Sequence, residues 1–477
     1  MMDQEQTWVA TEAVGDDEHT ANTVYRHFMR PEPREGLGPI REVDDPYLGR
    51  VKVRDLLVGM VRNAKDENKK RVTAYLHPYP HTRIDDAKPL QGWYKSLHEP
   101  KGVRPRPCFT EAVLTEPYGG WCAVGCAFCY VNSGFRGYRG TGLITVPLDY
   151  GAQVRKQLER TRRAAAGYFS SFTDPFTPLE DYYHNTRDAA QAFVDLGLPI
   201  FFLSRLKYPG WAVALMRKNP HSYAQKSINT SDPEDWRRLS PGALGYEDHL
   251  KDIHRIKRSG VYVSIQCNPV IPGVTSHAQI KKLFRDLKDA GADHVIVKFV
   301  EAGYSWAPAM AERMVKRFGD RGREFERLFT ENIGGQRTIE ERYRLNAHDL
   351  YSGWAKEFGL TYATCYEYEY RRDAAGNVLD KTGVSVGRRY TTAAQCHGQA
   401  VPVYTRESAA EPFHPVEECP PSGCLYCASE NGGEARCGDA LAGEANAVRY
   451  ADMKVPIGSG AARNENVPTI QLGVIRR

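Results

Sequence analysis

The chain is 477 residues long, with 41% hydrophobic and 26% charged residues, an ordinary composition for a soluble globular protein. Its 64 Lys and Arg residues outnumber its 59 Asp and Glu residues by only 5, a weaker basic excess than a dedicated nucleic-acid-binding protein carries. No run approaches the roughly 18 apolar residues that a membrane-spanning helix needs. The acidic N-terminus resembles neither a secretory signal nor a transit peptide, so we expect a cytoplasmic protein.

Residues 1–105 are rich in Pro, Arg and acidic residues and predict an irregular N-terminal extension that wraps the main domain. Residues 106–302 alternate short β-branched or aromatic runs with helical patterns, which indicates an α/β fold with a parallel sheet. Six strands with five crossovers predict a partial (β/α)6 TIM-like barrel, whose chemistry lies at the carboxyl ends of the strands. The predicted strands are Glu111–Thr115, Gly167–Phe172, Ile200–Ser204, Ser222–Ile228, Val261–Gln266 and His294–Val300, and the predicted helices are Ala152–Ala165, Thr186–Leu196, Gly210–Lys218, Leu244–Ser259 and His277–Ala290.

Residues 303–477 predict a third domain, helical at first and rich in cysteine towards its end. Helical patterns at Pro308–Phe318 and Ile339–Phe358 precede a strand-like piece at Leu360–Tyr366. The segment from Cys396 to Cys437 has too few apolar residues to bury a core of its own. We therefore expect a metal or a cluster to fix its shape.

The 11 cysteines are odd in number and clustered, which argues against a disulfide framework and for metal binding. Cys122, Cys126 and Cys129 form a C-x-x-x-C-x-x-C motif directly after the first predicted strand. Three thiolates on a glycine-bearing loop can bind three irons of a cubane and leave the fourth iron without a protein ligand. A closed structural zinc site would need a fourth ligand.

This motif, with Phe128 at its aromatic position and βα repeats after it, resembles the radical S-adenosylmethionine (radical SAM) superfamily. The resemblance implies a 4Fe-4S cluster whose open iron binds S-adenosylmethionine. It also implies that an electron from a donor such as flavodoxin or ferredoxin cleaves this cofactor to a 5'-deoxyadenosyl radical, which abstracts hydrogen from the substrate. On this resemblance we expect Cys122, Cys126 and Cys129 to carry the chemistry, and Phe128 and Tyr130 to lie beside the cofactor.

Polar residues follow the later strands, where the superfamily binds S-adenosylmethionine. The alternative reading of these residues is helix capping, turn formation or solvated surface. The second strand resembles that of the spore photoproduct lyase branch, except that Ser171 stands where those lyases carry a hydrogen-donating cysteine. Lys298 lies inside a strand and must find a partner or point into the barrel. The predicted cofactor contacts are Ser171, Thr173, Asp174, Ser204, Lys207, Ser227 and Asn268.

A second group of cysteines predicts an auxiliary metal site in the third domain. Cys419, Cys424, Cys427 and Cys437 fall within twenty residues, and Cys365 and Cys396 are further candidate ligands. A second 4Fe-4S cluster is our interpretation, and a structural zinc knuckle is the alternative.

The sequence thus predicts a radical SAM enzyme that acts on a small polar or phosphorylated metabolite of nucleoside or sugar type. The auxiliary cluster would transfer electrons, bind substrate or donate sulfur. One alternative is a nucleic-acid lesion lyase or nucleic-acid-modifying enzyme, whose binding would depend steeply on salt. Another is a zinc-stabilised interaction protein without enzymatic activity.

Overall fold

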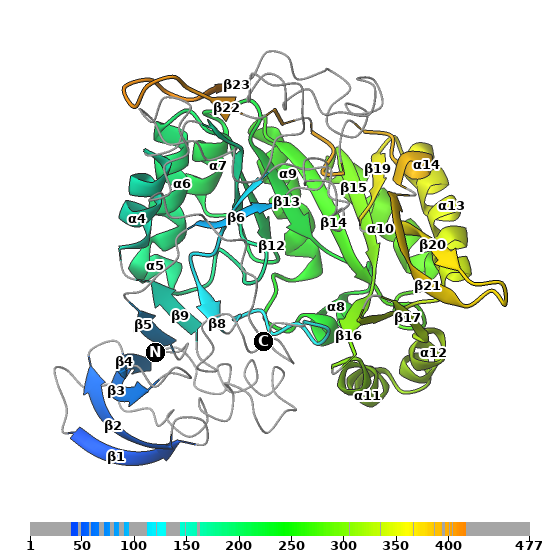
Figure 1. The fold of residues 1–477 in the computed structure, drawn as a ribbon, viewed down its shortest axis with the longest axis horizontal. Coiled ribbons are helices and arrows are strands. Elements are labelled where there is room, and N and C mark those ends of the chain that lie inside the picture. The colour runs from blue at the N-terminus through cyan, green and yellow to red at the C-terminus, as the bar shows by residue number, and fades with distance from the viewer. Residues whose placement is uncertain are drawn as a thin grey trace.

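The computed structural model describes residues 40–45, 49–56, 59–65, 71–76, 81–84, 90–94, 112–120, 122–129, 144–147, 149–159 and 163–415, apart from 305, 334, 366, 386, 394, 395, 400 and 403. Its centre is an eight-stranded sheet in the order β19-β15-β14-β13-β12-β11-β7-β6, in which only the pair β6 and β7 is antiparallel (Figure 1). The strands are β6 (Leu90–Tyr94), β7 (Ala112–Thr115), β11 (Ala166–Phe169), β12 (Ile200–Ser204), β13 (Tyr223–Ser227), β14 (Tyr262–Val270), β15 (His294–Phe299) and β19 (Thr361–Thr364).

Helices cover the outer face of this curved sheet. Strand residues alternate between a large core shared with the helices and a separate group that faces the barrel lumen, as the two-residue period of a strand requires. Because both faces are buried, β7 and β12 are nearly continuous apolar runs. The covering helices are α4 (Tyr150–Leu158), α6 (Asn185–Asp195), α7 (Gly210–Met216), α9 (Tyr246–Arg258), α10 (His277–Asp289) and α13 (Glu341–Glu357) (Figure 1).

Local sequence fixes several helix starts. Ser276 and Gln279 form a reciprocal capping box at the start of α10. Asp232 caps the following helix through the backbone N–H groups of Glu234 and Asp235, with Pro233 as its first residue. The shorter helices are α5 (Glu180–Tyr183), α8 (Pro233–Leu239), α11 (Ala307–Phe318), α12 (Asp320–Leu328) and α14 (Gly387–Tyr390).

The predicted α/β barrel is confirmed, with two differences. The strand-like piece at Leu360–Tyr366 is β19, which pairs in parallel with β15, so a seventh parallel strand from the third predicted domain extends the barrel sheet. The helix predicted to reach Ala165 ends at Leu158, and Arg163–Ala164 instead forms β10, which pairs with β22 (Tyr404–Thr405). Pairing with a distant strand thus overrides the helix propensity of an alanine run.

Part of the N-terminal region predicted to be irregular forms strands. β1 (Ile40–Asp45), β2 (Gly49–Leu56), β3 (Gly59–Lys65), β4 (Arg71–Leu76) and β5 (His81–Ile84) continue into β9 (Ile144–Pro147) and β8 (Gly119–Gly120) as one sheet. This sheet leads directly into the loop that carries the first three cysteines. The remaining strands are β16 (Glu301–Gly303), β17 (Glu331–Ile333), β18 (Gln336–Thr338), β20 (Tyr368–Arg372), β21 (Val378–Ser385) and β23 (His414–Pro415).

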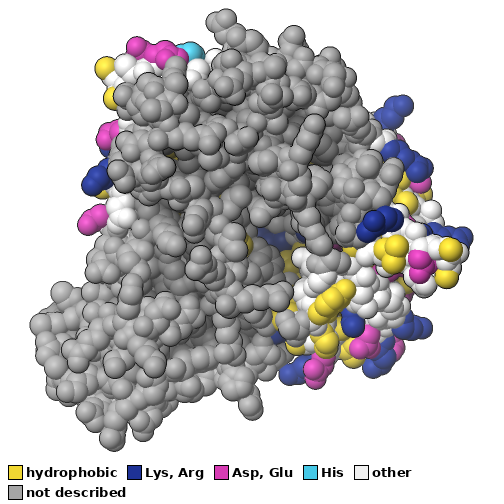
Figure 2. Space-filling model, in the orientation of Figure 1, with side chains coloured by type: hydrophobic (Ala, Val, Ile, Leu, Met, Phe, Trp, Pro, Cys, Tyr) yellow, Lys and Arg dark blue, Asp and Glu magenta, His cyan; other side chains and the backbone are white. Residues whose placement is uncertain are grey.

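On the face that Figure 2 shows, the described surface carries mixed charge. Over the side that holds α11 and α12, basic and acidic side chains are interspersed with hydrophobic ones and do not separate by sign (Figure 2). None of the helices in the described ranges is both long and apolar enough to cross a membrane.

Candidate functional site

The loop from Cys122 to Cys129, here called the cysteine loop, is held against the segment after α8. The backbone N–H of Ala127 donates to Leu239 O at 2.8 Å, and that of Gly242 donates to Val124 O at 2.9 Å. A Cβ at Gly242 would lie 2.4 Å from Ala123 O, so only glycine permits this approach of two backbones. The loop position therefore depends on residues more than a hundred positions away.

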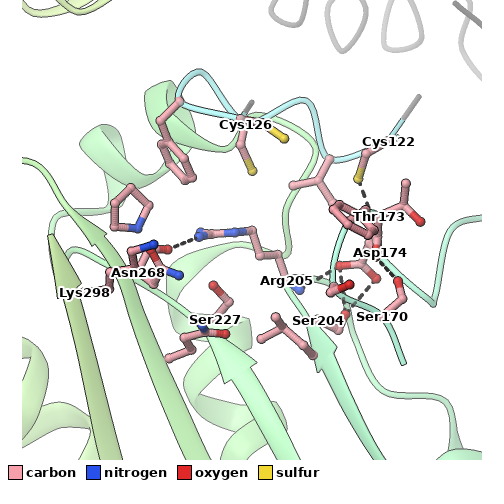
Figure 3. Close-up of a pocket in the computed structure, with 18 of the residues that line it drawn as sticks. Cys122, Cys126, Ser170, Thr173, Asp174, Ser204, Arg205, Ser227, Asn268 and Lys298 are labelled. Atoms are coloured by element: carbon pink, nitrogen blue, oxygen red, sulfur yellow. Dashed lines mark hydrogen bonds between the residues drawn. The ribbon is translucent and has the colours of Figure 1, made fainter. Parts of the chain in front are cut away.

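The thiols of Cys122, Cys126 and Cys129 line one cavity of about 210 Å³ at the mouth of the barrel (Figure 3). The backbone N–H of Asp174 donates to Cys122 Sγ, and the hydroxyl of Ser240 donates to Cys126 Sγ, both at 3.4 Å. Burial, Asp174 and the other two thiols raise the pKa of Cys122 well above its usual value. Three thiolates in this place need positive charge beside them, so the set fits an iron-sulfur cluster with hydrogen-bonded sulfurs.

A buried carboxylate holds the loop that follows β11. Glu116 Oε1 accepts hydrogen bonds from Ser171 N at 2.8 Å, Ser171 Oγ at 2.9 Å and Phe172 N at 3.0 Å. The hydroxyl of Thr173 donates to Tyr118 O at 2.9 Å. Burial raises the pKa of Glu116 to about 7, although its hydrogen bonds oppose this shift. Ser171 and Thr173 line the cavity, but their hydroxyl protons point to the protein. Sequence reasoning missed Glu116, which directly follows a strand.

Asp174 lines the cavity and ties two strand ends together. Its carboxylate accepts from Ser204 Oγ at 2.9 Å, Arg205 N at 2.7 Å and Phe176 N at 3.0 Å. These donors come from the β11 loop and the end of β12, so Asp174 and Ser204 brace each other. Their predicted contact with the cofactor remains a prediction.

Arg205 is one of two cations, with Lys298, among the described residues that line the cavity, and it was not among the predicted cofactor contacts. Its guanidinium donates to Asn268 O at 2.7 Å and to Ser240 Oγ at 3.3 Å, and lies 5.0 Å from the ring centroid of Phe128 (Figure 3). Lys207 is exposed and does not line the cavity. Strand β12 ends at Ser204, so the chain turns away before Lys207 can follow the inward side of the strand.

The floor and far wall of the cavity come from β13, β14 and β15. Ser227, Gln266, Asn268 and Lys298 all line it. Lys298 Nζ lies 3.2 Å from Glu301 Oε2, so this lysine has a partner and also lines the cavity. The structure therefore brings Ser227 and Asn268 together with the cysteine loop, as predicted.

A buried ion pair supports the site from the other face of β13. Lys226 Nζ lies 3.0 Å from Asp252 Oδ2 and donates to Leu206 O at 2.6 Å. Arg255 reaches the second oxygen of Asp252 at 2.7 Å. The backbone just after Arg205 is thus anchored to α9.

The second cysteine group is described only in part. Cys365, at the end of β19, packs with Cys396 against Ile296 and Ala363. Burial raises the pKa of the Cys365 thiol to about 12. The residues Cys419, Cys424, Cys427, Cys437 and Tyr130 lie outside the described residues.

Comparison with known proteins adds a close relative. The chain matches no protein-family model. It is 59% identical over 445 residues to a protein of Pseudomonas phage M6 named radical SAM Nα-GlyT isomerase, and the match covers 91% of this chain and 92% of the relative.

Solved structures match more loosely. A variant of spore photoproduct lyase matches with a TM-score of 0.44 and 15% identity, over 59% of this chain and 80% of the other. A radical SAM methyltransferase from Sphaerobacter thermophilus matches with a TM-score of 0.34 and 13% identity, over 76% and 89% of the two chains. Because the phage relative matches nine-tenths of both sequences at 59% identity, this chain belongs to the radical SAM family of enzymes.

Proposed function

We propose that this chain is a radical SAM isomerase that rearranges Nα-GlyT, the compound in the name of the phage relative. The observation that carries the proposal is the 59% identity to that relative over nearly the whole chain. The cavity supports it, since the cysteine loop and the polar ends of β13, β14 and β15 line one space. Membership of an enzyme family overturns the alternative of a zinc-stabilised protein without activity.

We read the name in ordinary biochemical shorthand as glycine joined through its α-nitrogen to a thymine. We propose attachment at the thymine C5 methyl carbon, because this leaves the ring and its sugar-bearing nitrogen intact. The C–H bond of the glycine α-carbon is a favourable site for hydrogen abstraction, because the adjacent nitrogen and carboxylate both stabilise an unpaired electron on that carbon. When bound, the cluster and S-adenosylmethionine supply the carbon radical that removes this hydrogen and can return it.

Ser171 is compatible with an isomerase. Spore photoproduct lyases carry a hydrogen-donating cysteine at the matching place, whereas Ser171 donates its hydroxyl proton to Glu116. An isomerase conserves the atoms of its substrate, so the hydrogen that was removed can return, and no separate donor is required. We propose that Ser171 shapes the cavity and takes no part in hydrogen transfer.

The remaining roles are assigned by charge and position. We assign Cys122, Cys126 and Cys129 to the cluster and Arg205 to the carboxylate of S-adenosylmethionine, since guanidinium groups bind carboxylates through paired donors. Lys298 and Glu301 supply opposite charges for the carboxylate and the amine of a glycine. Ser227 and Asn268 offer neutral hydrogen bonds to the ribose of the cofactor.

We retain the division into 1–105, 106–302 and 303–477 as a proposal, with β19 added to the barrel. A second cluster held by Cys419, Cys424, Cys427 and Cys437 is likewise proposed, with Cys365 and Cys396 as alternative ligands. An electron donor such as flavodoxin or ferredoxin and a cytoplasmic setting complete the proposal.

The test is turnover by anaerobically reconstituted and reduced protein. Nα-GlyT is supplied as the free nucleoside in one arm and within a DNA oligonucleotide in the other, which separates a metabolite enzyme from a nucleic-acid-modifying one. We expect a product of unchanged mass and altered chromatographic retention, and deuterium from the glycine α-carbon should appear in S-adenosylmethionine. Cys126→Ala should abolish the reaction. A product of different mass in both arms would contradict an isomerase.

A further inference from the structure

Side chains inside the barrel lie in rows that strand register sets. The lowest registered row runs Leu114, Tyr168, Phe201, Tyr223 and Tyr262, and its central rings stack with centroids 4.5 Å apart. These residues form a cluster separate from the core under the helices. They make an apolar floor for the lumen.

Two rows that include polar side chains lie between this floor and the cysteine loop. The first pairs Leu203, Gln225, Ser264 and His294 across adjacent strands. The second pairs Ser227, Gln266, Ile296 and Ala363. Ser227 and Gln266 line the cavity with the three cysteines, so the second row is the one nearer the mouth.

Several polar atoms of these rows find no partner among the described residues. Both carboxamide atoms of Gln225, the hydroxyl of Ser264 and Oε1 of Gln266 are buried there without a hydrogen bond. Gln225 and Ser264 are fully buried, and Gln266 is 9% exposed. Leaving such a group unsatisfied destabilises the fold, and native proteins rarely tolerate it. Neighbouring groups of this kind, one of them on a cavity wall, indicate a ligand.

The residues of these two rows are uncharged, which limits the kind of ligand that they can bind. Burial lowers the pKa of His294 to about 4, so its ring is neutral, and it is already bonded to Cys396 O at 2.8 Å. The charged groups of the cavity lie above, where Arg205 turns to Asn268 O and Lys298 pairs with Glu301. Carboxamide and hydroxyl groups can hydrogen-bond to an uncharged ligand whose edge alternates acceptors and donors.

Building on the proposed function, we propose that Gln266, with Gln225 and Ser264 beneath it, binds the imide edge of the substrate thymine. In that edge the ring N–H lies between two carbonyls. A carboxamide matches it by accepting from the N–H and donating to one carbonyl, and a hydroxyl can donate to the other. With the imide inward, C6 points towards the mouth. The C5 substituent and the bond to the sugar then both leave on the side of the cysteine loop, where hydrogen abstraction must occur.

Binding to the cluster-loaded, unreduced protein with S-adenosylmethionine tests this inference without turnover. The probes are thymidine and a tetrathymidylate, each compared with its N3-methylated counterpart by equilibrium dialysis. The two lengths distinguish a free nucleoside from a base within DNA. We expect N3-methylation to weaken binding by about fivefold or more for at least one length, since the buried groups that met the ring N–H are then left without a partner.

The matched variants are Gln266→Met in the lumen and Gln191→Met on the partly exposed face of α6. Gln266→Met should weaken binding of the unmethylated probe about tenfold and erase the preference over the methylated one, with the affinity for S-adenosylmethionine unchanged. Gln191→Met should behave as wild type. Equal binding of both probes by wild type, absence of saturable binding of either length, or a preference retained in Gln266→Met would overturn the inference.

The binding test of this inference and the turnover test of the proposed function can fail independently of each other. Discrimination against the N3-methyl group without isomerisation would refute the reaction and leave base recognition standing. Isomerisation by a protein that binds both probes equally would do the reverse.

Discussion

Folding buries the carboxylate of Glu116. The variant Glu116→Gln measures how much this burial lowers the free energy of unfolding. The side chain is fully buried, and its pKa rises from 4.5 to about 7 because of that burial. Each pKa unit corresponds to about 1.4 kcal/mol, so this rise corresponds to about 3 kcal/mol. The folded state holds the proton more tightly than the unfolded chain does. The free energy of unfolding therefore falls by this amount between about pH 4.5 and pH 7 and is constant above.

A glutamine keeps an oxygen for the N–H groups of Ser171 and Phe172 but cannot ionise. We therefore expect Glu116→Gln to gain about 2 kcal/mol of stability relative to wild type as the pH rises from 5.5 to 8. Anaerobic urea unfolding of the reconstituted protein at pH 5.5, 6.5 and 8 measures the difference. The exposed Glu326→Gln is the control for loss of a surface carboxylate. A difference between Glu116→Gln and wild type that does not change with pH would refute the reasoning.

Three further substitutions test the support of the site. Gly242→Ala brings a Cβ to 2.4 Å from Ala123 O, so we expect lower iron and sulfide content per protein with unchanged far-ultraviolet circular dichroism. Arg205→Lys cannot keep both guanidinium hydrogen bonds, and should weaken S-adenosylmethionine binding in equilibrium dialysis by about tenfold at unchanged iron content. Lys226→Met leaves Asp252 buried with less charge compensation and should lower the free energy of unfolding by about 3 kcal/mol. An unshifted urea midpoint would contradict that cost.

The architecture was predictable from the sequence because parallel strands buried on both faces are recognisable apolar runs. Ile200–Ser204 was predicted with the bounds that β12 has. The prediction that failed was the helix that was to reach Ala165, because local helix propensity was overridden by pairing with a distant strand. The alanine run before Gly167 favours a helix, but Arg163–Ala164 pairs with a strand more than two hundred residues away. No short window of sequence contains that information.

The cysteine loop was predictable because its spacing is local, whereas the groups that position it are not. Glu116 is one acidic residue among 59 Asp and Glu residues, and only the fold shows that it holds the backbone of residues 171 and 172. Lys207 was the predicted contact and Arg205 was not, although the end of β12 at Ser204 was predicted correctly. Which side chain beyond that end turns into the cavity depends on contacts with distant residues, such as the hydrogen bond from Arg205 to Asn268 O.

Strand β13 reads Tyr-Ala-Gln-Lys-Ser, and its most polar residue points away from the lumen. Lys226 pairs with Asp252 under the helices, whereas Gln225 belongs to the lumen row registered with Ser264. A shift of one residue would exchange them and place a cation at the depth where the neutral amide of Gln225 now lies. Under the proposed function, a cation there would attract the carboxylate of the proposed substrate inward, and its glycine would point away from the cysteine loop. On that proposal, the register of one five-residue strand decides which end of the substrate meets the cofactor.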